Sequence, residues 1–259
     1  MKNMDNKYIK NEEELKRLLS LAMMAGKMML RSGAETYRVE DTVERICRSR
    51  INTENVDAFV TSTGIFISVE YGTEILTQLK RVKNISTDLN RISMVNEFSR
   101  KFVNSDITIE EGIKELISID SKGTSEIIKA ISGSSAAAFF SLMFGGTIRD
   151  FIATILVSFF VILILNKLSK MNLTFFIDNF IGAFLASLFS YFSIRLGIGE
   201  NLDLVIIGSI MYLLPGVSIT NAIRDTMSGD YISGSSRGTE AIFAALAIAF
   251  GVGVVLAYI

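Results

Sequence analysis

Two polar runs in the sequence carry candidate functional side chains, and the first of them could recognise a small anion. The first follows residue 217 and contains Ser218, Asn221, Arg224, Asp225 and Arg237. A guanidinium group matches a carboxylate in bidentate geometry, so the two arginines could hold an anionic substrate. The alternative is that they are solvated loop charges that set membrane topology.

Pro215-Gly216, which contains the only proline of the chain, interrupts an apolar segment just before this run. Proline removes one backbone hydrogen bond from a helix and bends it, and Gly216 adds backbone freedom. One interpretation is a structural kink repaired by Ser218 or Thr220. The other is a broken helix whose second half, from Val217, points its N-terminal N–H groups at a substrate carboxylate.

Asp178 lies about one helical turn inside another apolar segment, beside Asn179. Ionisable groups within membrane segments are rare and face a partner or a wet cavity. Asp178 is therefore either a solvated residue at the membrane edge or a carboxylate that couples transport to protons or cations.

The second polar run follows Ser32 and contains Glu35, Tyr37, Arg38 and Glu40. Glu35 and Arg38 are three residues apart, so they can form an ion pair on one helix face. Ser32 with Glu35 predicts a capping box that opens this helix. Capping and the helix dipole alone would explain acidic residues at this position.

The composition excludes several other kinds of site. The chain has no histidine and one cysteine, which excludes a histidine-dependent nucleophile, an intrachain disulfide and a Cys- or His-cluster metal site. The cysteine, Cys47, lies on an apolar helix face and is expected to be a buried small hydrophobe. A net charge of −1 without a basic run gives no reason to expect nucleic-acid binding. We expect no metal, no cofactor and no enzymatic activity.

The distribution of charge divides the chain in two. Residues 1–126 hold 39 of the 53 Asp, Glu, Lys and Arg residues, and the remainder is strongly apolar. This contrast predicts a soluble domain over residues 1–126 and a membrane domain over residues 127–259. Because no removable targeting segment is apparent near the start, the soluble domain is expected in the cytoplasm.

The periodicity of residues 1–126 predicts an α+β fold. Helical spacing covers residues 11–30, 32–50, 89–102 and 108–119. Between the second and third helices, residues 56–61, 64–71 and 74–82 are rich in β-branched and aromatic residues, which predicts three strands in a meander. Lys122 to Ser125 is the expected linker into the membrane.

The second half is expected to form an all-α bundle of five transmembrane helices. The five apolar segments cover residues 127–147, 151–166, 175–196, 204–223 and 241–259. Loop charges favour a cytoplasmic N-terminus, since Lys167, Lys170, Arg224 and Arg237 would lie inside and only Arg149 and Arg195 outside. Small residues at four-residue spacing predict close helix packing in three stripes: Gly133/Ala137, Gly182/Ala186/Ser190 and Ala245/Ala249/Gly253.

The segment Leu21–Arg50, with Gly33-Ala-Glu-Thr-Tyr-Arg-Val-Glu40 at its centre, resembles the signature of the threonine/serine exporter (ThrE) family. The run from Leu214-Pro-Gly216 through Asn221, Arg224-Asp225, Gly229-Asp230 and Gly234 resembles the same family. The similarity covers nearly the whole chain. The chain is similar to the long YjjP-type subunit of a split form, which works with a short YjjB-type subunit.

The resemblance implies secondary export of a small amino acid, threonine or serine, across the bacterial plasma membrane. Succinate, a dicarboxylate, is the alternative substrate, and a non-transporting membrane scaffold or regulator is the alternative function. The motif residues carried over are Glu35, Tyr37, Arg38, Glu40, Pro215, Gly216, Asn221, Arg224 and Asp225. The Pro-Gly break and Arg224 are expected to contact the substrate, and Glu35 with Arg38 to couple the cytoplasmic domain to the gate.

Overall fold

The computed structural model of the chain describes residues 7–83, 85–121, 123, 125–169 and 174–259. The linker residues Lys122 and Thr124 and the loop charge Lys170 lie outside this set. The chain divides into two compact units, one formed by Met1–Gly123 with Val217–Gly238 and the other by Thr124–Gly216 with Thr239–Ile259. A domain boundary at residue 126 stays a prediction.

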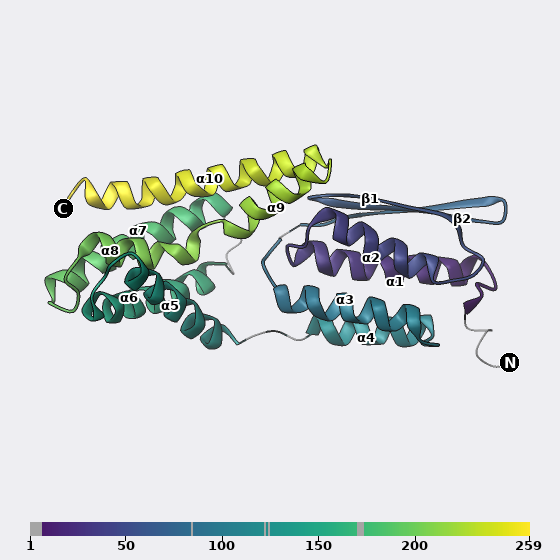
Figure 1. Cartoon of the computed structure of the whole chain (residues 1–259), viewed down its shortest axis with the longest axis horizontal. Helices are drawn as coiled ribbons and strands as arrows, with labels where there is room; N and C mark the ends of the chain where they lie inside the picture. Colours follow the sequence, from purple (N-terminus) through teal and green to yellow (C-terminus); the bar gives the residue numbers. More distant parts are fainter. Residues whose placement is uncertain (1–6, 84, 122, 124, 170–173) are drawn as a thin grey trace. The chain divides into compact units, whose positions relative to one another are not determined.

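The first unit has three layers, which Figure 1 shows as a sheet, a middle pair of helices and an outer pair. The sheet contains β1 (Glu54–Thr61), β2 (Gly64–Tyr71) and β3 (Glu74–Arg81). The middle pair is α1 (Glu12–Arg31) and α2 (Thr36–Arg48), and the outer pair is α3 (Leu89–Asn104) and α4 (Ile109–Ser121). The strands run antiparallel in the order β1-β2-β3, which confirms the predicted meander.

Alternation along the strands separates a buried from an open face of the sheet. Val60, Ile65 and Ile67 are fully buried in the core that the sheet shares with the helices. Phe59 pairs with Phe66 across the strands, and both are exposed on the other face. Each buried aliphatic side chain contributes about 1.5–3 kcal/mol, so the buried face holds the sheet on α1 and α2.

The capping box predicted for α2 is wrong. The helix begins at Thr36, and the side chain of its N-cap residue, Glu35, accepts no hydrogen bond from the first turn of the helix. The carboxylate of Glu35 is bound to two arginines instead, and another residue caps the helix, as described below.

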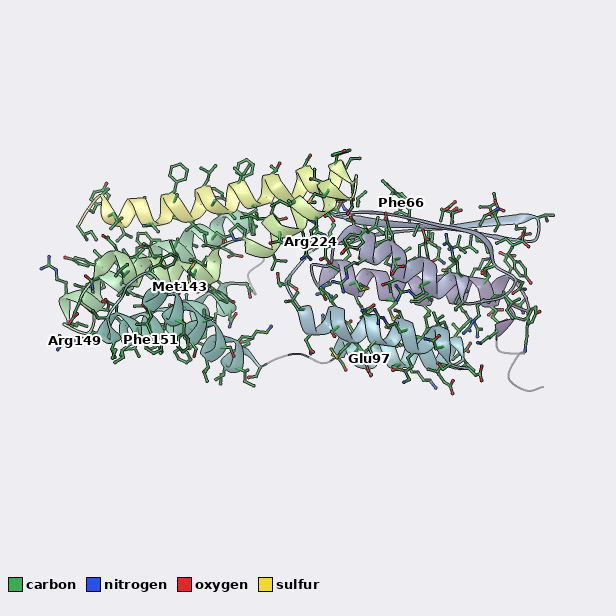
Figure 2. The ribbon with its side chains drawn as sticks, viewed as in Figure 1. Phe66, Glu97, Met143, Arg149, Phe151 and Arg224 are labelled. Atoms are coloured by element: carbon green, nitrogen blue, oxygen red, sulfur yellow. The ribbon has the colours of Figure 1, made fainter. Side chains whose placement is uncertain are left out.

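The second unit is built from helices whose outward side chains are apolar. Its helices are α5 (Glu126–Met143), α6 (Ile148–Leu168), α7 (Phe175–Arg195), α8 (Leu202–Ile210) and the 3₁₀ turn η3 (Met211–Leu213). The chain continues through α9 (Gly216–Met227) and α10 (Tyr231–Leu256), most of α9 and the first turns of α10 belonging to the first unit. In Figure 2, Met143 and Phe151 illustrate the apolar surface of this unit, and Glu97 the charged surface of the first.

Three described helices, α6, α7 and α10, are long and apolar enough to cross a membrane. A fourth span would result if residues Leu202–Leu213 (α8 with η3) and α9 form one broken span, with a bend of 53° between the two parts. The predicted five spans are therefore not confirmed. The difference includes α5, whose 18 residues contain Glu126, Lys129 and several serines that lower its mean hydropathy.

Small residues pack the apolar helices, but not all three predicted stripes lie inside. In α5, Ala137 is buried and Gly133 is half-buried. Gly182, Ala186 and Ser190 of α7 are buried, as predicted. Ala245, Ala249 and Gly253 of α10 are exposed, so that prediction is wrong. The buried face of α10 instead contains Ala241, Ala244, Ala247 and Gly251. A side chain at Gly251 would meet the carbonyl oxygen of Phe180 at 2.5 Å, which explains why glycine stands there.

Candidate functional site

The helices α9 and α10 form a tight hairpin in the first unit. Gly229 turns the chain with a φ of +90°, a left-handed conformation that favours glycine. Asp230 then caps α10, since its carboxylate accepts the backbone N–H of Ser233 at 3.1 Å. Gly234 lets α10 approach α9 closely, because a side chain there would collide with the backbone of Ala222 and Thr226.

This hairpin binds the turn between α1 and α2. The side-chain amide of Asn221 donates to the carbonyl oxygen of Gly33 at 2.8 Å, and Arg237 donates to that of Ala34 at 2.7 Å. Gly33, with a φ of +84°, reverses the chain just after the end of α1. We call the polar cluster formed here the joint. It consists of Gly33, Ala34, Glu35, Thr36, Arg38, Asn221, Arg224, Asp225 and Arg237.

Asp225 lies at the centre of the joint and is fully buried. Its Oδ1 accepts the backbone N–H of Thr36 at 3.2 Å and the hydroxyl of Thr36 at 2.9 Å. Its Oδ2 lies 3.1 Å from Nε of Arg237, whose side chain is 7% exposed. A carboxylate at a helix N-terminus satisfies free N–H groups and complements the helix dipole. Asp225 thus supplies the cap that the local sequence of α2 lacks.

Glu35 is the second buried acid of the joint. Its carboxylate pairs with Arg38 at 3.1 Å and with Arg224, whose guanidinium on α9 is marked in Figure 2. Burial raises the pKa of Glu35, but its own backbone N–H, Arg224 and Arg38 outweigh this and hold the pKa below the usual value. Glu35 is therefore ionised at neutral pH.

The charges of the joint are paired with one another, although Oδ2 of Asp225 and Nε of Arg237 face each other without hydrogen-bond geometry. Buried ions are costly to desolvate, and removing one partner leaves the other uncompensated. Glu35 and Asp225 are matched by Arg38, Arg224 and Arg237, so the arginines have carboxylate partners before any substrate arrives. Arg224 keeps 56% of its side chain exposed, and a solute could therefore still reach it.

The strand β1 and the turn that follows it contact the elements around the joint. The carboxylate of Glu40 accepts the backbone N–H of Val60 in β1 at 2.8 Å, and the hydroxyl of Ser233 accepts that of Ser62 at 3.0 Å. Burial raises the pKa of Glu40, opposed by the bond from Val60, and the nearby carboxylates of Asp230, Glu44 and Asp225 raise it further. Glu40 thus links α2 to the sheet beside the joint.

The remaining predicted residues lie outside the joint. Tyr37 is exposed, and Ser218 is half-buried on α9. Pro215 ends the 3₁₀ turn and α9 begins at Gly216, which confirms the predicted helix break. Asp178, near the start of α7, is half-buried and belongs with Pro215 to the second unit.

Asp150 is a buried acid that was not predicted from the sequence. Asp150, at the start of α6, accepts hydrogen bonds from the backbone N–H and hydroxyl of Thr147, the backbone N–H of Glu200, and the backbone N–H and side chain of Asn201. It therefore fastens the loop before α6 to the loop before α8. The spacing of Thr147 and Asp150 is a capping-box pattern that could have revealed it.

An α+β unit, long apolar helices and a proline-broken helix together define an integral membrane protein with a large polar domain. Comparison with known families shows to which family of membrane proteins the chain belongs. A family model described as "Putative threonine/serine exporter" matches residues 20–259, and the chain belongs to this family, ThrE. The resemblance carried by the two motifs is confirmed.

A curated relative shows the same affiliation. A protein of Mycobacterium tuberculosis named "Probable threonine/serine exporter" is 20% identical over 242 residues, which cover 92% of this chain and 45% of the relative. The chain thus spans less than half the length of this relative. No solved structure matches the chain.

Proposed function

We propose that this chain is one half of a secondary transporter that exports threonine or serine across the bacterial plasma membrane, with its polar domain in the cytoplasm. The observation that carries the proposal is the family match over residues 20–259. A second small membrane subunit supplies the other half. This part of the proposal rests on the resemblance to the long subunit of the split form.

In this transporter the joint couples the cytoplasmic domain to α9. The arginine that sequence reasoning assigned to the substrate, Arg224, already has a carboxylate partner in Glu35, which favours a coupling role. A substrate carboxylate that reaches the exposed part of Arg224 competes with Glu35 by the same chemistry. Substrate contact at rest is left to the helix break at Pro215, where the first turn of α9 begins and its positive dipole end lies.

Efflux from loaded cells tests the transport function. Cells are loaded with labelled threonine, serine or succinate and express the chain alone, the short membrane protein of a neighbouring reading frame alone, or both. Faster efflux of threonine or serine with both proteins supports the proposal, and faster efflux of succinate alone reassigns the substrate. If no solute leaves faster with both, the chain is a scaffold or regulator.

Labelling of single cysteines tests the topology. Cys47 is fully buried, and burial raises the pKa of its thiol to about 12, so Cys47→Ser gives a quiet background. In that background, Lys16→Cys on α1 should be protected in intact cells from a membrane-impermeant maleimide. Tyr258→Cys, at a position 89% exposed, should react if the number of spans is odd. Labelling of the α1 position in intact cells would contradict a cytoplasmic domain.

A further inference from the structure

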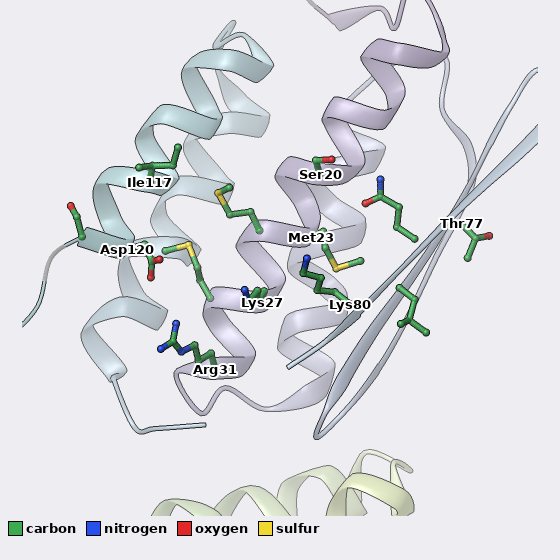
Figure 3. A pocket seen from close by; sticks show the side chains of 13 residues that line it. Ser20, Met23, Lys27, Arg31, Thr77, Lys80, Ile117 and Asp120 are labelled. Carbon is green, nitrogen blue, oxygen red and sulfur yellow. The ribbon is translucent and has the colours of Figure 1, made fainter. Parts of the chain in front are cut away.

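A cavity of about 810 Å³ lies in the first unit between α1, β3 and α4 (Figure 3), and no residue of the joint lines it. Cavities of roughly 300–1,000 Å³ are typical of sites for small organic ligands. Thirteen residues line it, six of them from α1. Its position and size make it a candidate ligand site that the transport reaction does not use.

The floor of the cavity is made of methionines. Met23, Met24 and Met28 of α1 all line the cavity, and Met24 and Met28, which are four residues apart, share a helix face. Leu79 of β3 and Ile117 of α4 add apolar surface from the two sides. Thioether side chains are flexible and polarizable, and they adapt to apolar ligands of different shapes.

Three cations surround this floor. Lys27 and Arg31 come from α1, and Lys80 extends from β3 toward α1 (Figure 3). Within the described part of the chain, none of the three forms an ion pair. The one acid of the lining, Asp120, pairs with Arg91 at 3.5 Å. The cavity therefore combines an apolar floor with uncompensated positive charge.

We propose that this cavity binds a small amphipathic carboxylate, with its headgroup between Lys27 and Lys80 and its aliphatic tail on the methionines. A nucleotide fits less well, because the described lining residues include no aromatic side chain to stack on a base. Threonine and serine lack an apolar tail, so this ligand is distinct from the proposed cargo.

The cavity and the joint share the end of α1. Arg31 lines the cavity and is the last residue of the helix, and Gly33, two residues later, accepts the hydrogen bond from Asn221. A ligand that orders this last turn therefore acts on the segment that holds the hairpin. A ligand bound in the polar domain could thus regulate the joint.

Methyl-group NMR of the full chain in lipid nanodiscs tests the proposal, with octanoate as the probe. The ¹³C-methyl signals of Met23, Met24 and Met28, assigned by single Met→Leu variants, should shift in a saturable manner. Met143 and Met227, which are 67% and 82% exposed and lie outside the cavity, report general effects of the probe on lipid or protein. Octanol, which has the same tail and no charge, should bind about tenfold more weakly, the effect of losing one charge-assisted contact.

Charge variants separate the cavity from nonspecific attraction. The double variant Lys27→Gln/Lys80→Gln should bind octanoate at least about tenfold more weakly. Lys83→Gln, a matched loss of charge at an exposed residue outside the lining, should leave the affinity unchanged. Equal binding of octanol and octanoate, equal effects of the two sets of variants, or shifts that follow those of Met143 would each overturn the proposal. These readouts do not depend on transport.

Discussion

Asp225 caps the first turn of α2 through Thr36, although the two residues are 189 positions apart in the sequence. One carboxylate oxygen accepts both the backbone N–H and the hydroxyl of Thr36. Because Glu35 directs its own side chain to arginines, α2 depends on this distant residue for its cap. The start of α2 and the α9–α10 hairpin should therefore be stable only together.

Asp225→Asn should loosen this contact while preserving the size of the side chain. The variant leaves Arg237 buried without its ion-pair partner, a change that costs about 3 kcal/mol. Hydrogen exchange of the Thr36 amide should accelerate by about 100-fold. Asp41→Asn is the matched control. Asp41 lies on α2, the helix that begins at Thr36, and 62% of its side chain is exposed. Similar acceleration in both variants would show that Asp225 is not the cap.

The ion pair of Glu35 with Arg224 should show a measurable coupling energy. In a double-mutant cycle of Glu35→Gln and Arg224→Gln, we expect about 1 kcal/mol of coupling in the protection of the Thr36 amide, because Arg224 is half exposed and Arg38 remains as a second partner. The pair of Arg17 and Glu110, in which both side chains are more than half exposed, should show almost none. Additive effects of the two Gln variants would place Arg224 outside the joint.

Glu40 should make the protein less stable as the pH rises. Its pKa is raised in the folded state by burial and by nearby carboxylates, so between the unfolded and the folded pKa the native protein binds more protons than the unfolded chain. Stability therefore falls as the pH rises through that window, just above about pH 4.3. Glu40→Gln can still accept the N–H of Val60, and it should reduce the change of the thermal midpoint with pH in that window. Glu97→Gln, at an exposed residue of α3, should keep the wild-type slope.

The elements of the first unit were predictable because their signals are local. Residues 64–71 alternate apolar and polar side chains, and β2 covers the same residues. Glu35 and Arg38 are one turn apart, so their pairing followed from helix geometry. Such patterns need no information about the rest of the chain.

The joint was not predictable from those signals because its partners are distant in sequence. Nothing local distinguishes an Arg224 that will meet Glu35 from one that faces solvent. The apolar residues Ile219 and Ile223 also extended the predicted fourth span into α9, whereas the structure groups Val217–Gly238 with the first unit. One signal was available: Asn221 and Asp225 are four residues apart, which sets them on one polar face of α9.

Two glycines of α10 should respond differently to the same substitution. At Gly234 an added methyl group would overlap the hydroxyl of Thr226 and lie 3.0 Å from the carbonyl oxygen of Ala222 and 3.1 Å from the backbone nitrogen of Thr226. Gly234→Ala should therefore push α9 away and cost about 1–3 kcal/mol, seen as a lower thermal midpoint and faster amide exchange in α9. At Gly238 the nearest atom, Cβ of Ala222, is 3.9 Å away, so Gly238→Ala should be tolerated. Equal tolerance of both would mean that the hairpin is not closely packed.

The helix break at Pro215 should matter for export, and its glycine should not. Pro215→Ala restores a backbone N–H and allows η3 and α9 to continue as one helix, which removes the reason for the 53° bend. If the N-terminal end of α9 contacts the substrate, efflux should fall about tenfold, because one charge-assisted contact is lost. Gly216→Ala is the matched control: no atom lies within 4 Å of an added methyl group, and Gly216 is not among the residues of positive φ. Wild-type efflux with Pro215→Ala, at equal amounts of inserted protein, would remove the break from the transport path and leave the joint as the part of α9 that matters.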